Sequence, residues 1–159
     1  MRSLRILSLI AFVLFATSKA SAWLILVPIG PSNWAGYEFE EGWWVDTGEF
    51  LGWINPSLRR FDYVYVVELD AFIFMPASRV TEEGAWGFVF DGVERPTGID
   101  PEFAWGGFPA GGGSFHDTGR FLGAVKPVGD FVFLSRLGRF VYLPEGHVDG
   151  IGSWVYFYR

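Results

Sequence analysis

The sequence predicts an all-β protein, and three observations support that prediction. The apolar runs are short, aromatic and β-branched, and they end at Gly, Pro or Asp, as strands bounded by turns do. No stretch places apolar residues at helical spacing over three turns, and glycine and proline recur too often for a long helix. The sequence also contains an internal repeat of one unit, so each strand expected in the first copy has a counterpart in the second.

The repeat is clearest at residues 46–52 and 117–123, which both read Asp-Thr-Gly-x-Phe-Leu-Gly. Ten identities occur in the alignment that sets Asp46 beside Asp117. After a three-residue deletion near residues 57–60 the alignment shifts to set Asp62 beside Asp130, and it contains eight more identities. We therefore assign the first unit to residues 34–90 and the second to residues 105–158.

Each unit is expected to contain four strands, at residues 50–54, 63–67, 72–75 and 86–90 and at residues 121–125, 131–134, 140–143 and 154–158. The two middle strands of each unit should pair as a tight hairpin. Single helical turns are expected within residues 76–83 and 144–149. The two four-stranded antiparallel units should pack as a small sandwich or barrel. An outer-membrane barrel is the rival, but its strands need about ten residues, roughly twice the length of these runs.

The first 22 residues have the features of a secretory signal peptide. Two arginines precede an apolar stretch at residues 6–16, and the small-residue site Ala20-Ser21-Ala22 follows. The stretch has about half the ~20 residues that a membrane-spanning helix needs. We expect cleavage before Trp23, export to the periplasm, cell surface or medium, and no transmembrane span afterwards. Residues 23–33 are then a lead-in, and residues 91–104 a surface linker between the units.

Composition excludes several classes of partner. The formal charge of −6 becomes −9 without the three basic residues of the leader, and Lys126 is then the only lysine. Such an acidic chain is a poor ligand for nucleic acid or anionic lipid. The chain has no cysteine, so disulfides are impossible and stability must come from packing, including that of the many aromatic rings.

A family resemblance rests on four motifs. These are Asp-Thr-Gly-Glu-Phe-Leu-Gly-Trp-Ile-Asn at 46–55, Tyr-Val-Tyr at 63–65, Phe-Ile-Phe-Met-Pro at 72–76 and Gly-Ala-Trp-Gly-Phe-Val-Phe at 84–90. The chain resembles uncharacterised aromatic modules found near the ends of exported proteins of aquatic bacteria. The likeness covers both units, although Ala124 stands where the pattern has a Trp53-type residue. It implies export and a modular role, and no specific activity. A looser likeness is to the Gly-Trp and Tyr-Tyr repeats of cell-wall-binding proteins.

The paired Asp-Thr-Gly turns allow two interpretations. In an aspartic protease, two such turns bring together carboxylates that share a proton. Here a glutamate and an arginine follow the turns where that family has a small residue, and the units are too short for protease lobes. We therefore favour structural turns, in which Asp46 and Asp117 bond the backbone and Gly48 and Gly119 adopt an unusual backbone angle.

The repeat also sorts the aromatic residues. Tryptophans kept in both copies are expected to serve the shared fold; they are Trp34, Trp86, Trp105 and Trp154. Three others have Ser114, Phe115 and Ala124 opposite them. With a nearby tyrosine, these make up the candidate binding residues: Trp43, Trp44, Trp53 and Tyr37. Exposure of Trp43 and Trp53 in one plane would favour sugar binding, and burial of both would favour a purely structural role.

Two smaller patterns complete the expectations. The copies differ in charge at Glu49 and Arg120 and at Glu68 and Arg136, which is compatible with opposite-charge pairs between the units or with independent solvated charges. The two histidines have neither the partners nor the spacing for a metal site or a catalytic triad, so no metal and no cofactor are expected.

These expectations favour an exported, non-catalytic structural or interaction module of the cell envelope or extracellular space. Its partner would be an envelope polysaccharide or another exported protein. A carbohydrate- or cell-wall-binding module that uses exposed tryptophans is the alternative, and an aspartic-protease-like hydrolase is the remote one.

Overall fold

The computed structural model describes residues 32–40, 42–56, 62–95 and 97–159. The expected leader and all but the last two residues of the lead-in lie outside the described residues, as does the deletion near residues 57–60. The described residues all belong to one compact unit, which is all-β. Among them, no helix has the length and apolar character needed to span a bilayer.

The two repeats contain the same strands in the same order. The first repeat has β1 Asn33–Trp34, β2 Tyr37–Glu38, β3 Val45–Asp46, β4 Trp53–Pro56, β5 Tyr63–Val66, β6 Ala71–Phe74, the 3₁₀ turn η1 Ala77–Arg79 and β7 Gly84–Phe90. The second has η2 Pro101–Phe103, β8 Ala104–Trp105, β9 Phe108–Pro109, η3 Gly112–Ser114, β10 His116–Asp117, β11 Ala124–Val128, β12 Phe131–Leu134, β13 Arg139–Tyr142, η4 Glu145–His147 and β14 Gly152–Tyr158.

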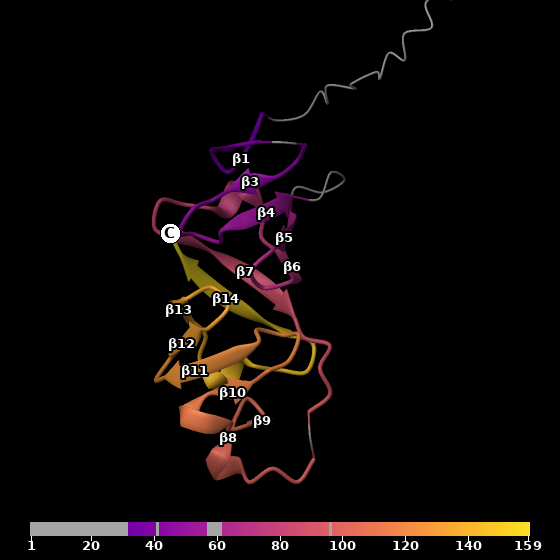
Figure 1. Ribbon diagram of the computed structural model, residues 1–159, viewed down its shortest axis with the longest axis vertical. Coiled ribbons are helices and arrows are strands. Elements are labelled where there is room, and N and C mark those ends of the chain that lie inside the picture. The colour runs from indigo at the N-terminus through magenta and orange to yellow at the C-terminus, as the bar shows by residue number, and fades with distance from the viewer. Residues whose placement is uncertain (1–31, 41, 57–61, 96) are drawn as a thin grey trace, which may run out of the picture. The chain divides into compact units, whose positions relative to one another are not determined.

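Ten of these strands form one antiparallel sheet, in the order β10-β11-β12-β13-β14-β7-β6-β5-β4-β3. The last strands of the two repeats, β7 and β14, lie side by side in its middle (Figure 1). The pairs β1-β2 and β8-β9 form two small separate sheets. Within the described part of the chain, β3 and β10 end the order and the sheet does not close. The expected sandwich or barrel of two four-stranded units is therefore not confirmed.

The register of β7 and β14 relates the repeats by a local pseudo-twofold axis. Gly87 lies opposite Val155, which is its equivalent in the second repeat. Gly84 lies opposite Tyr158, and Gly152 lies opposite Phe90, so exchanging the repeats reproduces the register. The repeat thus acts as two halves that meet through the same strand, like the self-complementary interface of a symmetric dimer.

One face of the sheet is the core. Every second residue of the longer strands is buried, as the two-residue period of a strand requires. These buried side chains are mostly aliphatic, and those of both repeats fall in one hydrophobic cluster. The close approach there needs Gly87, where a Cβ atom would lie 2.8 Å from the Cε atom of Met75.

Turns of the two repeats also meet away from the central strand pair. Arg136 donates a hydrogen bond to the carbonyl oxygen of Leu69 (2.6 Å), and Arg139 donates one to that of Phe50 (3.2 Å). Arg139 also lies 3.8 Å from the carboxylate of Glu49. Glu49 therefore pairs with Arg139 in place of Arg120. In the pair of Glu68 and Arg136, Arg136 donates to the backbone carbonyl oxygen of Leu69 in place of the Glu68 carboxylate.

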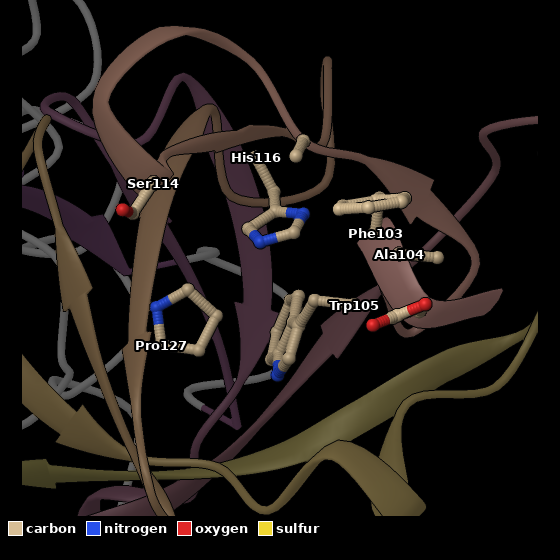
Figure 2. Close-up of a pocket in the computed structure, with 8 residues that line it drawn as sticks. Phe103, Ala104, Trp105, Ser114, His116 and Pro127 are labelled. Carbon is tan, nitrogen blue, oxygen red and sulfur yellow. The ribbon is translucent and has the colours of Figure 1, made fainter. Parts of the chain in front are cut away.

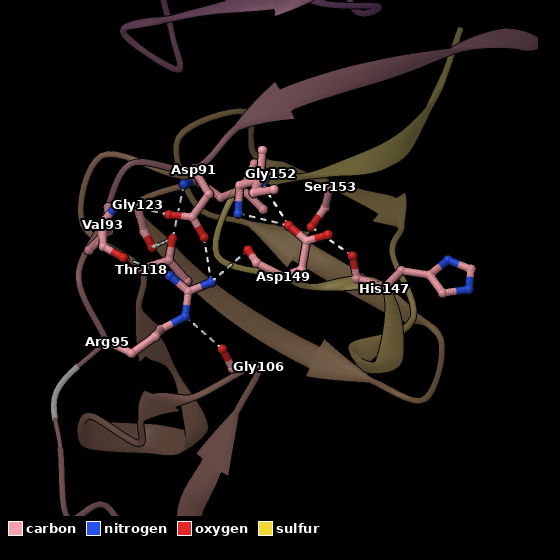
Figure 3. A network of polar contacts seen from close by, with 12 residues as sticks. Asp91, Val93, Arg95, Gly106, Thr118, Gly123, His147, Asp149, Gly152 and Ser153 are labelled. Carbon is pink, nitrogen blue, oxygen red and sulfur yellow. Dashed lines mark hydrogen bonds and ion pairs between the residues drawn. The ribbon is translucent and has the colours of Figure 1, made fainter.

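A polar network anchors the connection between the repeats, the segment that the sequence assigned to a surface linker (Figure 3). The Asp91 side chain is fully buried and pairs with Arg95. Arg95 also donates hydrogen bonds to the carbonyl oxygens of Gly106 (2.9 Å) and Asp149 (3.2 Å), and its guanidinium group lies 3.8 Å from the centre of the Phe108 ring. A single arginine thus ties the connection to the second repeat.

The observed elements follow most of the expected ones. Both middle hairpins form, and both predicted helical turns are present as η1 and η4. The first expected strand of each unit began too early in the chain, because the turns at residues 46–52 and 117–123 occupy those positions. The two-residue strands β1–β3 and β8–β10 were missed, since so short a run carries no periodicity.

Candidate binding surface

The face of the sheet opposite the core is covered by aromatic rings. Seven outward positions in each repeat carry Phe, Tyr or Trp, and the seven are equivalent in the alignment of the repeats. They are Tyr63, Tyr65, Phe72, Phe74, Trp86, Phe88 and Phe90 in the first repeat and Phe131, Phe133, Phe140, Tyr142, Trp154, Tyr156 and Tyr158 in the second. We call these fourteen residues the aromatic face. All of them are exposed or half-buried.

Each repeat contributes a tryptophan to the other repeat's ring cluster. Trp154 contacts Phe74 and Phe88 of the first repeat, with ring centres 6.2 and 5.4 Å apart. Trp86 contacts Tyr142 and Tyr156 of the second repeat in the same way, at 6.0 and 5.4 Å. The aromatic face is therefore continuous across the pseudo-twofold axis.

Most rings of the aromatic face meet edge to face. The Trp86–Tyr142 planes are inclined by 85°, and the Phe88–Phe90 planes by 79°. This is the arrangement that the ring quadrupole favours. Neighbouring rings are therefore inclined to one another and do not form one flat platform.

A hollow of about 460 Å³ interrupts the aromatic face. Phe74, Trp86 and Trp154 line it together with Pro76 and Arg79. The guanidinium group of Arg79 has no carboxylate partner within the described residues. The hollow thus combines three aromatic walls with one positive charge, and it can accept an apolar side chain that carries or adjoins an acidic group.

None of the four predicted binding residues is among the fourteen of the aromatic face, but Trp53 lies on the same side of the sheet, two residues before Asn55, which is paired with Tyr65. Trp53 and Trp44 are exposed, at 40% and 38% of their maximal areas. Trp43 is half-buried and meets Phe39 edge-on, with ring centres 5.3 Å apart. The half-buried Tyr37 ring carries the guanidinium group of Arg159 at 4.5 Å. No ring contact joins the four to one another in the described part of the chain.

Trp53 is exposed and Trp43 is half-buried. The two are therefore neither both exposed, which would have favoured sugar binding, nor both buried, which would have favoured a purely structural role. Of the tryptophans kept in both copies, Trp34 and Trp105 are buried. Trp86 and Trp154 are 42% and 45% exposed, and each packs against rings of the other repeat. A residue retained in both copies can therefore belong to a shared surface as well as to a shared core.

The Asp-Thr-Gly segments form two matching turns. Asp46 accepts a hydrogen bond from the backbone N–H of Gly48, and Asp117 from that of Gly119, both at 2.8 Å. These glycines have φ values of 59° and 61°, in the left-handed region. The buried threonine side chain of each turn donates to the carbonyl oxygen five residues ahead and accepts from the N–H four residues ahead.

The two aspartates are held apart. They lie on β3 and β10, the two ends of the sheet order, with eight strands between them. Each carboxylate is engaged in its own turn, and no hydrogen bond joins the two. This geometry does not supply the shared-proton pair of an aspartic protease. Among the described residues, no group of His, Asp and Glu is arranged to hold a metal ion.

The sequence already contained a signal for the aromatic face. Residues 63–66 and 72–74 alternate aromatic with aliphatic side chains, as do residues 88–90. Hydropathy alone does not separate the two sides of such a strand because both are apolar. Here the two sides of each strand differ in residue type, because one side carries aromatic rings and the other carries aliphatic side chains. In comparisons with protein-family models, curated proteins and solved structures, nothing matches this chain.

Proposed function

We propose that this chain is an exported, non-catalytic interaction module that binds another exported protein through the aromatic face. The observation that carries the proposal is the continuous exposed ring surface built by both repeats. Monomeric soluble proteins rarely leave large contiguous apolar patches in water, and such patches usually mark binding sites. The proposal includes the two tandem units, each of which would supply half of the binding surface.

The chemistry of the surface supports a protein partner. The fourteen side chains are uncharged, and aromatic residues dominate the centres of protein interfaces. The hollow among the rings leaves room for a partner's side chain. The guanidinium group of Arg79 adds one site of charge complementarity.

Export is part of the proposal and rests on the sequence. The leader-like residues 1–22 and the resemblance to modules of exported proteins both support it. Fractionation of cells that express a C-terminally tagged chain would test export separately. Recovery of a cytoplasmic form that retains residues 1–22 would contradict it.

A crosslinking experiment would test the binding surface. A photoreactive amino acid at Phe72 on β6 or at Phe140 on β13, where both rings are exposed, should yield a specific adduct with one partner protein in the native cells. The same probe at Ile151, which is 74% exposed but off the aromatic face, is the matched control. Equal adduct patterns at all three sites, or none at any, would contradict the proposal.

Glycan binding is the second candidate, favoured by the exposure of Trp53 and Trp44. Sugar rings stack on the open faces of tryptophan side chains. Affinity electrophoresis in gels that contain soluble polysaccharides would test it, with retardation expected to be lost in Trp53→Ala. Unchanged migration in every polysaccharide would remove this candidate.

A further inference from the structure

The second repeat contains a pocket that is separate from the aromatic face. Its volume is about 390 Å³, within the range of small-molecule sites. The pocket lies beside η2 and β8, and its lining includes Glu102, Phe103, Trp105, Ser114 and His116. Figure 2 shows the imidazole of His116 between Phe103 on one side and Ser114 and Pro127 on the other.

The first repeat carries larger side chains at two of the equivalent positions. In the alignment that sets Asp46 beside Asp117, Phe39 is the equivalent of Ala110 and Trp43 is the equivalent of Ser114. Phe39 and Trp43 pack edge to face with each other in the first repeat. In the second repeat both positions carry small side chains, and both of these residues line the pocket.

The same divergence places polar groups in the pocket. His116 stands where the first repeat has Val45. Its Nδ1 atom lies 3.1 Å from the carbonyl oxygen of Phe108, which can only accept a hydrogen bond. Nδ1 therefore donates, and in the neutral ring Nε2 is left as an acceptor. The carboxylate of Glu102 is exposed and has no salt-bridge partner among the described residues, so the pocket presents two acceptors.

Ser114 and the two aromatic residues complete the site. The backbone of Ser114 has φ 66°. This left-handed angle is uncommon for residues other than glycine and often occurs at functional sites. Phe103 is 61% exposed. The indole N–H of Trp105 is buried and has no hydrogen-bond partner in the described part of the chain.

We infer that this pocket binds one neutral, hexose-sized sugar unit of a glycan. The apolar C–H face of a pyranose fits against the exposed ring of Phe103. Its hydroxyl groups supply the donors that the Glu102 carboxylate and His116 Nε2 accept. An anionic ligand is disfavoured because Glu102 would repel it. This inference does not rest on the aromatic face or on Trp53.

Ligand-observed NMR on the folded chain would test the inference. The probes are the methyl glycosides of glucose, galactose, mannose and N-acetylglucosamine, with sodium glucuronate and tetramethylammonium chloride as charged comparisons. At least one neutral glycoside should show saturation transfer. Glu102→Ala, which removes the acceptor, should weaken its binding about tenfold, the loss expected for one hydrogen bond to a charged acceptor.

The first repeat supplies the matched variants. Ala110→Phe with Ser114→Trp places the first repeat's residues in the pocket and should abolish binding. The melting temperature should fall somewhat, because a tryptophan at position 114 must adopt the left-handed angle of Ser114 (φ 66°), which Trp43 does not have. If that pair does not fold, His116→Val removes the Nε2 acceptor without filling the pocket, together with the hydrogen bond from Nδ1 to Phe108, and should weaken binding at least about tenfold. Trp53→Ala should leave it unchanged. Absence of binding by all four glycosides, binding that survives in the filled pocket, or preference for tetramethylammonium would overturn the inference.

Discussion

The indole of Trp86 lies directly opposite Tyr156 in the β7–β14 register, and the two rings meet edge-on with their centres 5.4 Å apart. The two residues belong to different repeats, so their contact joins the halves of the aromatic face. Trp154 and Phe88 repeat the contact at the same separation across the pseudo-twofold axis.

Removal of this contact should have a measurable coupling energy. In a double-mutant cycle of Trp86→Ala and Tyr156→Ala, we expect a coupling of about 0.5–1.5 kcal/mol, the usual value of an aromatic pair. Urea unfolding would measure it. The pair Trp86 and Phe140, which share no ring contact, is the control and should give additive effects.

Gly84 should not tolerate a side chain. Its φ is 140°, and a Cβ atom would overlap the carbonyl oxygen of Phe157 on the paired strand. Gly84→Ala should lower the free energy of unfolding by about 1–3 kcal/mol through backbone strain and weakened β7–β14 pairing. Gly146→Ala, at a site with open space and no positive φ, should change it by less than about 0.5 kcal/mol. Equal melting temperatures of the two variants would contradict the assigned register.

The hydroxyl group of Thr118 should contribute to the stability of the fold. Its buried hydroxyl donates to the carbonyl oxygen of Gly123 (2.8 Å) and accepts from the N–H of Leu122 (2.9 Å). Thr118→Val keeps the shape and leaves these two backbone groups without that partner, at a cost of about 1–3 kcal/mol. Chemical denaturation would show the loss. Thr118→Ser, which keeps the hydroxyl, should lose less, and the reverse order would exclude this explanation.

Arg95 should stabilise the second repeat through the buried carboxylate of Asp91. Arg95→Met keeps part of the side-chain packing but leaves Asp91 without its charged partner. We expect a loss of about 3 kcal/mol in the free energy of unfolding. Adding Asp91→Asn to this variant should recover part of the loss, because the uncompensated charge is then absent. If the double variant is less stable than Arg95→Met, the ion pair is not the main contribution of Arg95.

Asp149 should contribute to stability only above acidic pH. Hydrogen bonds from the N–H groups of Gly152 and Ile151 lower the pKa of Asp149 below its ordinary value of 3.8. A carboxyl group with a lowered pKa in the folded state stabilises the fold above the ordinary value and loses that effect as the pH falls through the lowered one. Melting temperatures measured between pH 7 and pH 2 should therefore fall less steeply in Asp149→Asn. A parallel fall in both proteins would contradict this role.

Comparison of the two copies predicted much of the fold but little of the candidate site. Both hairpins and the matching turns at Asp46 and Asp117 could be read from turn chemistry, because Gly and Asp at those positions act locally. Trp86 and Trp154 were expected to serve the shared fold because they are retained. Their exposure depends on which side of the sheet faces inward, and the sequence pattern is apolar on both sides.

The pocket in the second repeat illustrates the same limit. The replacement of Phe39 and Trp43 by Ala110 and Ser114 is visible in the sequence. That Ala110 and Ser114 line one pocket together with His116 depends on the packing of η2, η3 and β8.

By itself, the sequence determined an all-β chain of two matching units with local turns at fixed places, because strand periodicity and turn geometry depend on neighbouring residues. Only the tertiary structure decided that β7 and β14 join the units in one sheet, that the rings cover its outer side, and that Ala110, Ser114 and His116 line one pocket. These features depend on contacts between segments far apart in the chain, and no local pattern encodes them.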